Sequence, residues 1–180
     1  FHAAAGGVGL IAGQWLAAKG VTAIGTAGGA AKCKLAKEAG YTHVIDYRKD
    51  DFVAKTMRLT KKAGVAAVYD SVGKDTYPGS LEVIRNFGTF VSFGQSSGPI
   101  SDFKIADLSA NGSLFATRPT LFHFIATPQE LARRSRQLFK MIGEGKIKIQ
   151  VNQKYKLGDI AKAHRDLEGR QTTGQTVLVP

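Results

Sequence analysis

A glycine-rich run near the start of the chain has the residue types and spacing most able to do chemistry. Gly6, Gly7 and Gly9 lie in the run Ala4–Gly9, between a short apolar segment and a stretch of small residues that predicts a helix. With Ala4 in the place of the first glycine, the spacing fits G-x-G-x-x-G. Such a turn brings backbone N–H groups and the positive end of a helix close to a phosphate. The run therefore predicts the pyrophosphate-binding turn of a dinucleotide site, although glycines also begin helices for packing alone.

The end of the next predicted strand indicates which dinucleotide. Sites specific for NAD place an acid about 20 residues beyond the glycines, where it accepts hydrogen bonds from the ribose 2′-hydroxyl. Here Gly28 stands 19 residues beyond Gly9, the turn 26–29 holds no acid, and Lys32 follows in the next helix. An open turn beside an ammonium group would admit and pair the 2′-phosphate that a carboxylate would repel. We therefore expect NADP(H) rather than NAD(H). Tyr47, at the end of the third strand, either reaches that phosphate or covers the edge of the core.

The elements that must position these residues follow from the alternation of short β-rich runs with helical segments, which predicts a parallel sheet. The expected strands are Phe1–Ala4, Val21–Thr26, His43–Asp46, Val65–Asp70, Thr89–Phe93 and Ser113–Thr117. The expected helices between them are Gly7–Lys19, Ala30–Ala39, Asp51–Lys62, Thr76–Asn86 and Ile105–Ala110. Six strands with crossover helices predict the doubly wound α/β fold known as the Rossmann fold. We expect residues 1–120 to form this domain, with a truncated first strand.

The pattern changes after residue 120. A long amphipathic helix is predicted over Pro128–Gly143, with one apolar stripe that we interpret as core. A strand over Val151–Leu157, a helix over Asp159–Glu168 and a strand over Thr176–Val179 complete the chain. Residues 121–180 are therefore expected to form an α+β tail.

Composition narrows the classes of function. The chain has 180 residues and a single cysteine, Cys33, which excludes an internal disulfide and a cysteine-based zinc site. No apolar run is long enough to span a bilayer, so we expect no membrane partner and a cytoplasmic location. The net charge of +11 by itself leaves nucleotides, nucleic acids and anionic membranes open as partners. Scattered basic residues without interleaved aromatics favour a solvated surface, so nucleic acid stays the less favoured alternative. The four histidines are dispersed, and we expect no metal site and nominate no catalytic residue.

Four segments add a wider resemblance. Residues 3–9, 69–73, 91–98 and 117–119, together and at matching spacing, resemble NADPH:quinone oxidoreductases. These belong to the zinc-independent, zeta-crystallin-like branch of the medium-chain dehydrogenase/reductase superfamily. The likeness extends over the whole chain and makes the assignment far more specific than the glycine run alone. The chain departs from many members of the superfamily at Gln175, where they carry a lysine, so any contact made by that lysine is in doubt.

The resemblance implies a set of cofactor contacts. It assigns Gly6, Gly7 and Val8 to the pyrophosphate turn, Gly28, Lys32 and Tyr47 to the 2′-phosphate, Phe93, Gly94, Gln95 and Ser96 to the nicotinamide half, and Arg170 to a further contact. Phe93 as a core residue and Arg170 as a solvated charge are the plainer alternatives. The implied reaction is hydride transfer from NADPH to a quinone, and reduction of an activated carbon–carbon double bond is the alternative within the superfamily. A nucleotide- or RNA-binding module is the alternative of another class.

The resemblance also implies partners. Chains of this family begin with a GroES-like catalytic domain, so we expect this chain to be the cofactor-binding portion and to be inactive alone. The tail would return to that absent domain, and the segment from Gln150 onward is expected to fold weakly or to pair with another copy. Members of the family dimerise through their sixth strands, which implies a homodimer through the edge Ser113–Thr117.

Overall fold

A parallel sheet flanked by paired helices forms the first two-thirds of the computed structural model, which describes residues 1–180. Its elements are α1 (Gly7–Ala18), β1 (Ile24–Ala27), α2 (Ala30–Glu38), β2 (His43–Asp46), α3 (Phe52–Leu59), β3 (Val65–Asp70), α4 (Tyr77–Glu82), β4 (Ile84–Ser92), α5 (Ile105–Ala110) and β5 (Phe115–Thr117). Strand β1 pairs in parallel with β2, and β4 lies between β3 and β5, also in parallel.

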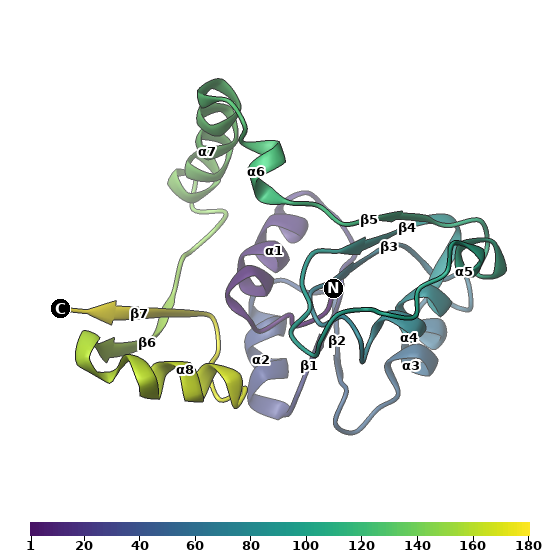
Figure 1. The fold of residues 1–180 in the computed structure, drawn as a ribbon, viewed down its shortest axis with the longest axis horizontal. Coiled ribbons are helices and arrows are strands. Elements are labelled where there is room, and N and C mark those ends of the chain that lie inside the picture. The colour runs from purple at the N-terminus through teal and green to yellow at the C-terminus, as the bar shows by residue number, and fades with distance from the viewer.

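The first residues of the chain join these two groups of strands. The N–H of Ala4 donates to the carbonyl of Thr26 in β1, and the N–H of His2 donates to that of Tyr69 in β3, both at 3.0 Å. The order across the sheet is therefore β2, β1, the segment 1–4, β3, β4 and β5. Helix α1 contacts α2 and α3 contacts α4, and Figure 1 shows these two pairs to either side of the strands. The predicted doubly wound fold is confirmed.

Small residues let α1 lie close to the centre of the sheet. A Cβ on Gly9 would lie 2.4 Å from the carbonyl oxygen of Ala3, so no larger residue fits without moving backbone. A Cβ on Gly13 would lie 2.5 Å from the ring of buried Tyr41, whose hydroxyl donates to the carbonyl of Gly9 at 2.9 Å. On the other side of the sheet, six apolar residues form the larger core cluster: Val68, Leu81, Val83, Ile84, Phe90 and Leu114.

Several predicted boundaries were wrong, among them the start of β1, at Ile24 rather than Val21, and the end of α3, at Leu59 rather than Lys62. Helix α4 ends at Glu82 rather than at Asn86 because the N–H of Val65 donates to the carbonyl of Val83 at 2.8 Å, which draws the following residues into β4. Helix α3 begins one residue later than predicted because Asp51 is its N-cap and accepts from the N–H of Val53 at 2.8 Å.

The tail consists of α6 (Leu121–Phe124), α7 (Pro128–Gly143), β6 (Val151–Lys156), the 3₁₀-helix η1 (Leu157–Asp159), α8 (Ile160–Glu168) and β7 (Gln175–Val179). Strands β6 and β7 pair with each other in parallel, and Figure 1 shows them with α8 beside α1 and α2, whereas α6 and α7 project above α1. The weak folding expected after Gln150 stays a prediction, as does the domain boundary at residue 120. No helix has the length and apolar character needed to cross a membrane.

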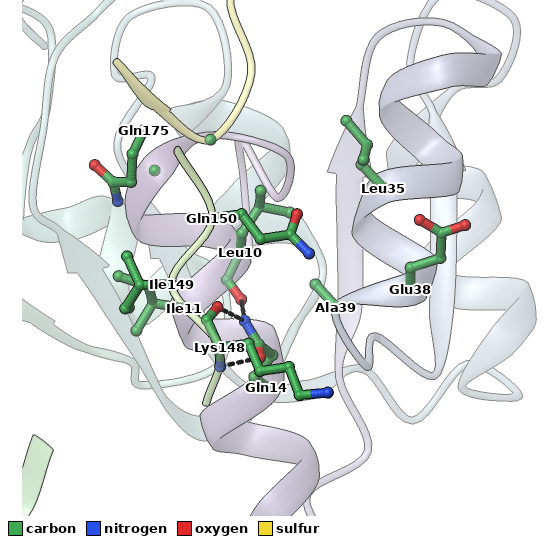
Figure 2. Close-up of a pocket in the computed structure, with 12 residues that line it drawn as sticks. Leu10, Ile11, Gln14, Leu35, Glu38, Ala39, Lys148, Ile149, Gln150 and Gln175 are labelled. Carbon is green, nitrogen blue, oxygen red and sulfur yellow. Dashed lines mark hydrogen bonds between the residues drawn. The ribbon is translucent and has the colours of Figure 1, made fainter. Parts of the chain in front are cut away.

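Side-chain and backbone contacts hold the tail against α1. The amide of Gln14 donates to the carbonyl of Lys148 at 3.1 Å and accepts from its N–H at 2.8 Å, as Figure 2 shows. The N–H of Gly174 donates to the carbonyl of Ala5 at 2.9 Å, directly before the glycine turn. The tail is therefore placed next to the turn that the sequence marks for phosphate.

Candidate functional site

A cavity of about 710 Å³ opens where the parallel strands end. Its walls include Gly6 from the first turn, Gly28 after β1, Tyr47 after β2, Val72 after β3 and Ser96 after β4. These positions follow the carboxyl ends of the segment 1–4 and of four strands, which is where open α/β sheets bind ligands. The tail supplies one further wall through Leu167, Glu168, Arg170 and Thr172, at and after the end of α8.

The glycine turn forms one part of this cavity. The first N–H groups of an α-helix have no intrahelical acceptor, and the N-cap of α1, Gly6, has no side chain that could accept from them. A Cβ on Gly6 would lie 3.2 Å from the carbonyl of Ala3. Val8 is 62% exposed and does not line this cavity. The turn can therefore offer free N–H groups and the positive end of the α1 dipole to an anion.

Gly7 lies on a second and smaller cavity of about 130 Å³ between α1, α2 and the tail, which Figure 2 shows. The amide nitrogen of Gln175 is 2.8 Å from the position of a Cβ on Gly7, so the side chain of Gln175 covers this glycine. Gln175 does not line the larger cavity.

Basic residues gather around Gly28. The ammonium of Lys32 donates to the carbonyl of Arg170 at 2.5 Å. Burial lowers the pKa of Lys32, and the nearby charges of Arg48 and Arg170 lower it further. The hydroxyl of Tyr47 is 2.5 Å from the position of a Cβ on Gly28, so only glycine leaves room for the ring. We call Gly28, Lys32, Tyr47, Arg48 and Arg170 the phosphate corner.

The cations of the phosphate corner form no salt bridge. No salt bridge in the chain involves Lys32, Arg48 or Arg170. The nearest strand-end acid, Asp46, accepts instead from the N–H groups of Gly29 and Arg48, at 2.8 and 3.1 Å. The bond from Gly29 is the largest cause that lowers the pKa of Asp46. The corner thus has the charge and the donors that a phosphate dianion requires.

The structure brings together some of the predicted site residues and leaves others apart. Gly6, Gly28, Lys32, Tyr47, Ser96 and Arg170 line the larger cavity, whereas Gly7, Val8, Phe93, Gly94 and Gln95 do not. Phe93 is half-buried, and its ring centroid is 5.6 Å from that of Phe1. Sequence reasoning missed Arg48, whose guanidinium lies 3.4 Å from a Cβ position on Gly29. Its only sequence signal is its place directly after Tyr47.

The loop Phe93–Gly98, which we call the post-β4 loop, closes the cavity at Ser96. A Cβ on Gly94 would lie 2.7 Å from the carbonyl oxygen of Ser71, so this loop lies directly on the backbone that follows β3.

No group of three or more His, Cys, Asp or Glu side chains that could hold a metal ion occurs in the chain.

Comparison with known proteins places this fold and site in a family. The family model described as zinc-binding dehydrogenase matches residues 39–178. Because the match covers most of the chain, the chain belongs to this family.

The resemblance to quinone oxidoreductases is confirmed by individual proteins. The chain is 47% identical over 182 residues to a quinone oxidoreductase of Salmonella typhimurium, covering 100% of this chain and 56% of that protein. It matches the crystal structure of Escherichia coli quinone oxidoreductase complexed with NADPH with a TM-score of 0.97 and 47% identity, covering 100% of this chain and 56% of that one. A 2-haloacrylate reductase of Burkholderia is 38% identical, covering 99% of this chain and 54% of that protein. The chain thus spans little more than half the length of these relatives.

Proposed function

We propose that this chain binds NADP(H) and forms the cofactor-binding part of an NADPH-dependent quinone oxidoreductase. The observation that carries the proposal is the phosphate corner, where Lys32 and Arg170 line a 710 Å³ cavity, Arg48 lies close to Lys32, and none of the three forms a salt bridge. A repulsive group of cations is stabilised by a bound dianion, and a 2′-phosphate is the dianion that distinguishes NADP(H) from NAD(H).

The residues of the cavity fit such a cofactor. The free N–H groups at the start of α1 would hold the pyrophosphate, with Gly6 leaving room for its approach. Lys32 and the hydroxyl of Tyr47 would pair the 2′-phosphate, with Arg48 and Arg170 beside them. The post-β4 loop would lie along the nicotinamide half, through Phe93, Gly94, Gln95 and Ser96. When bound, NADPH supplies the hydride, and the chain orients it and excludes water. We propose no catalytic residue.

We propose a quinone as the substrate because identity to the quinone oxidoreductase, at 47%, exceeds identity to the 2-haloacrylate reductase, at 38%. The RNA-binding alternative has less support, since Lys32 and Arg170 line one cavity rather than an extended basic stripe. We also propose a zinc-independent reaction.

We propose a homodimer formed through β5. This strand pairs with β4 on one side only, and Phe115 is 63% exposed on it. An unpaired strand edge with an apolar side chain favours pairing with a second copy.

We further propose a cytoplasmic location, which the free thiol of Cys33 supports. We also propose that residues 1–120 form the cofactor-binding domain and that residues 121–180 form an appended tail.

Competition and turnover test this proposal separately. In NADPH fluorescence titrations, 2′,5′-ADP should displace the cofactor at concentrations where 5′-AMP does not, because only the former carries a phosphate for the phosphate corner. Equal displacement by the two nucleotides would contradict recognition of the 2′-phosphate by the phosphate corner. NADPH oxidation by the complete protein, followed at equal concentrations of 1,4-benzoquinone and 2-chloroacrylate, should be faster with the quinone. Faster oxidation with 2-chloroacrylate would favour the double-bond alternative.

A further inference from the structure

A fully buried carboxylate lies beside the cavity without a cationic partner. Asp70, the last residue of β3, has no exposed surface and forms no salt bridge. Four neutral groups donate to it: the N–H groups of Val72 (2.8 Å) and Gly73 (3.0 Å) and the hydroxyls of Thr76 (2.8 Å) and Ser80 (2.9 Å). A buried charge is tolerated only where donors of this kind satisfy it. The backbone around Asp70 is therefore organised by its carboxylate.

The hydrogen bonds continue from Asp70 through Ser80 and His2 to Thr26 in β1. Because the hydroxyl proton of Ser80 goes to Asp70, its oxygen accepts from Nε2–H of His2 at 3.0 Å. The other ring nitrogen, Nδ1, then accepts from the hydroxyl of Thr26 at 2.9 Å. His2, Thr26 and Ser80 are all buried. Burial lowers the pKa of His2 to about 4, although Asp70 raises it, and the neutral ring that results matches this order of donors.

The post-β4 loop is hydrogen-bonded to the same backbone segment that the Asp70 carboxylate organises. The N–H of Ser96 donates to the carbonyl of Ser71 at 3.1 Å, and the N–H of Ser97 donates to that of Val72 at 2.8 Å. The carbonyl of Asp70 itself accepts from the N–H that begins the loop, at 2.8 Å. The carboxylate of Asp70 and the post-β4 loop are thus both hydrogen-bonded to the same short segment of backbone, residues 70–73.

We propose that the buried chain of Thr26, His2, Ser80 and Asp70 positions the post-β4 loop for the nicotinamide half of the cofactor. In this account Asp70 is a positioning residue that acts through the turn after β3 and does not touch the cofactor. The inference rests on the proposed NADP(H) binding. Ser80 and Asp70 lie on α4 and β3, whereas the phosphate corner is built on the turns after β1 and β2, on α2 and on the tail. Loss of the Ser80 hydroxyl should therefore affect the nicotinamide half of the cofactor and spare the 2′-phosphate.

The substitution Ser80→Ala tests this separation, because it removes the hydroxyl that joins His2 to Asp70 and leaves both backbone donors to Asp70 in place. Two ligands are compared by isothermal titration calorimetry: NADPH and 2′-phospho-ADP-ribose, which lacks only the nicotinamide. We expect binding of NADPH to weaken about tenfold and binding of 2′-phospho-ADP-ribose to change less than about twofold. Ser109→Ala is the matched control, since this exposed hydroxyl donates only to the carbonyl of Ala106 within α5. It should leave both affinities unchanged.

Equal weakening of both ligands by Ser80→Ala, or no weakening of either, would overturn the inference while leaving the proposed function standing. A wild-type chain that binds neither ligand would overturn both. Hydrogen exchange of Ser80→Ala without ligand gives a second readout. The amides of Ser96 and Ser97 should exchange about tenfold faster, whereas those of Val44 and Ile45 in β2 should keep their rates. Unchanged exchange at Ser96 and Ser97 would contradict the inference whatever the binding data show.

Discussion

The burial of His2 makes the stability of the chain depend on pH in a way that can be calculated. In the unfolded chain the His2 imidazole has a pKa near 6.5, whereas in the folded chain burial lowers the pKa of this imidazole to about 4. Between these values the unfolded state binds more protons, so stability falls as the pH falls. Each pKa unit is worth about 1.4 kcal/mol, so the loss approaches about 3 kcal/mol below pH 4 and is about 2 kcal/mol between pH 7 and pH 5.

The assay is urea unfolding at pH 7 and pH 5, with the free energy of unfolding extrapolated to water. Wild type should lose about 2 kcal/mol more than the variant His2→Gln over this interval, because glutamine cannot take up the proton. His43→Gln is the matched control, since His43 is exposed, and it should behave as wild type does. Equal losses for wild type and His2→Gln would refute a neutral His2 in the folded chain, and with it the direction of the hydrogen bonds that lead to Asp70.

Three further predictions follow from the packing. Gly9→Ala should lower the free energy of unfolding by about 1 to 3 kcal/mol in urea titrations, because its Cβ would lie 2.4 Å from a backbone oxygen. The control variant Gly143→Ala, whose Cβ would have nothing within 4 Å, should not lower it. Equal stabilities of the two variants would refute the close approach of α1 to the sheet. Phe115→Lys should shift a dimer to monomers in light scattering if β5 is the interface, and a dimer that survives the charge would rule that edge out. Gln14→Ala removes the two hydrogen bonds that join the Gln14 side chain of α1 to Lys148 in the tail, so trypsin should cut the tail faster while the sheet stays intact. An unchanged cleavage rate would show that these two bonds do not hold the tail in place.

Much of the fold could be predicted because local sequence carries it. The alternation of apolar runs with helical segments predicted the strands and helices in their order along the chain, and the glycine spacing predicted the start of α1 directly after the first strand segment. The spacing of Gly28 and Lys32 along the chain was enough to bring both to one cavity, since parallel strands end at the same edge of a sheet. Helix α6 was missed because its four residues are too few to show a helical period.

The rest of the site depends on contacts between residues far apart in sequence. His2 and Ser80 are 78 positions apart, and neither carries a motif that marks a link to the other. Arg170 was assigned only through a family resemblance, and the structure shows that its carbonyl, rather than its charge, is what Lys32 contacts. The carboxylate of Asp46 stands at a strand end close to the phosphate corner, and only the geometry shows that it binds backbone N–H groups there.

The central claim is that the phosphate corner selects NADP(H), and the most direct test is a comparison of dissociation constants for NADPH and NADH by fluorescence titration. Wild type should bind NADPH at least about tenfold more tightly, and Lys32→Ala should remove most of that preference by weakening NADPH and sparing NADH. Lys34→Ala is the matched control, because Lys34 lies in the same helix but outside the cavity. Equal affinities for the two cofactors in wild type, unaffected by Lys32→Ala, would contradict the account.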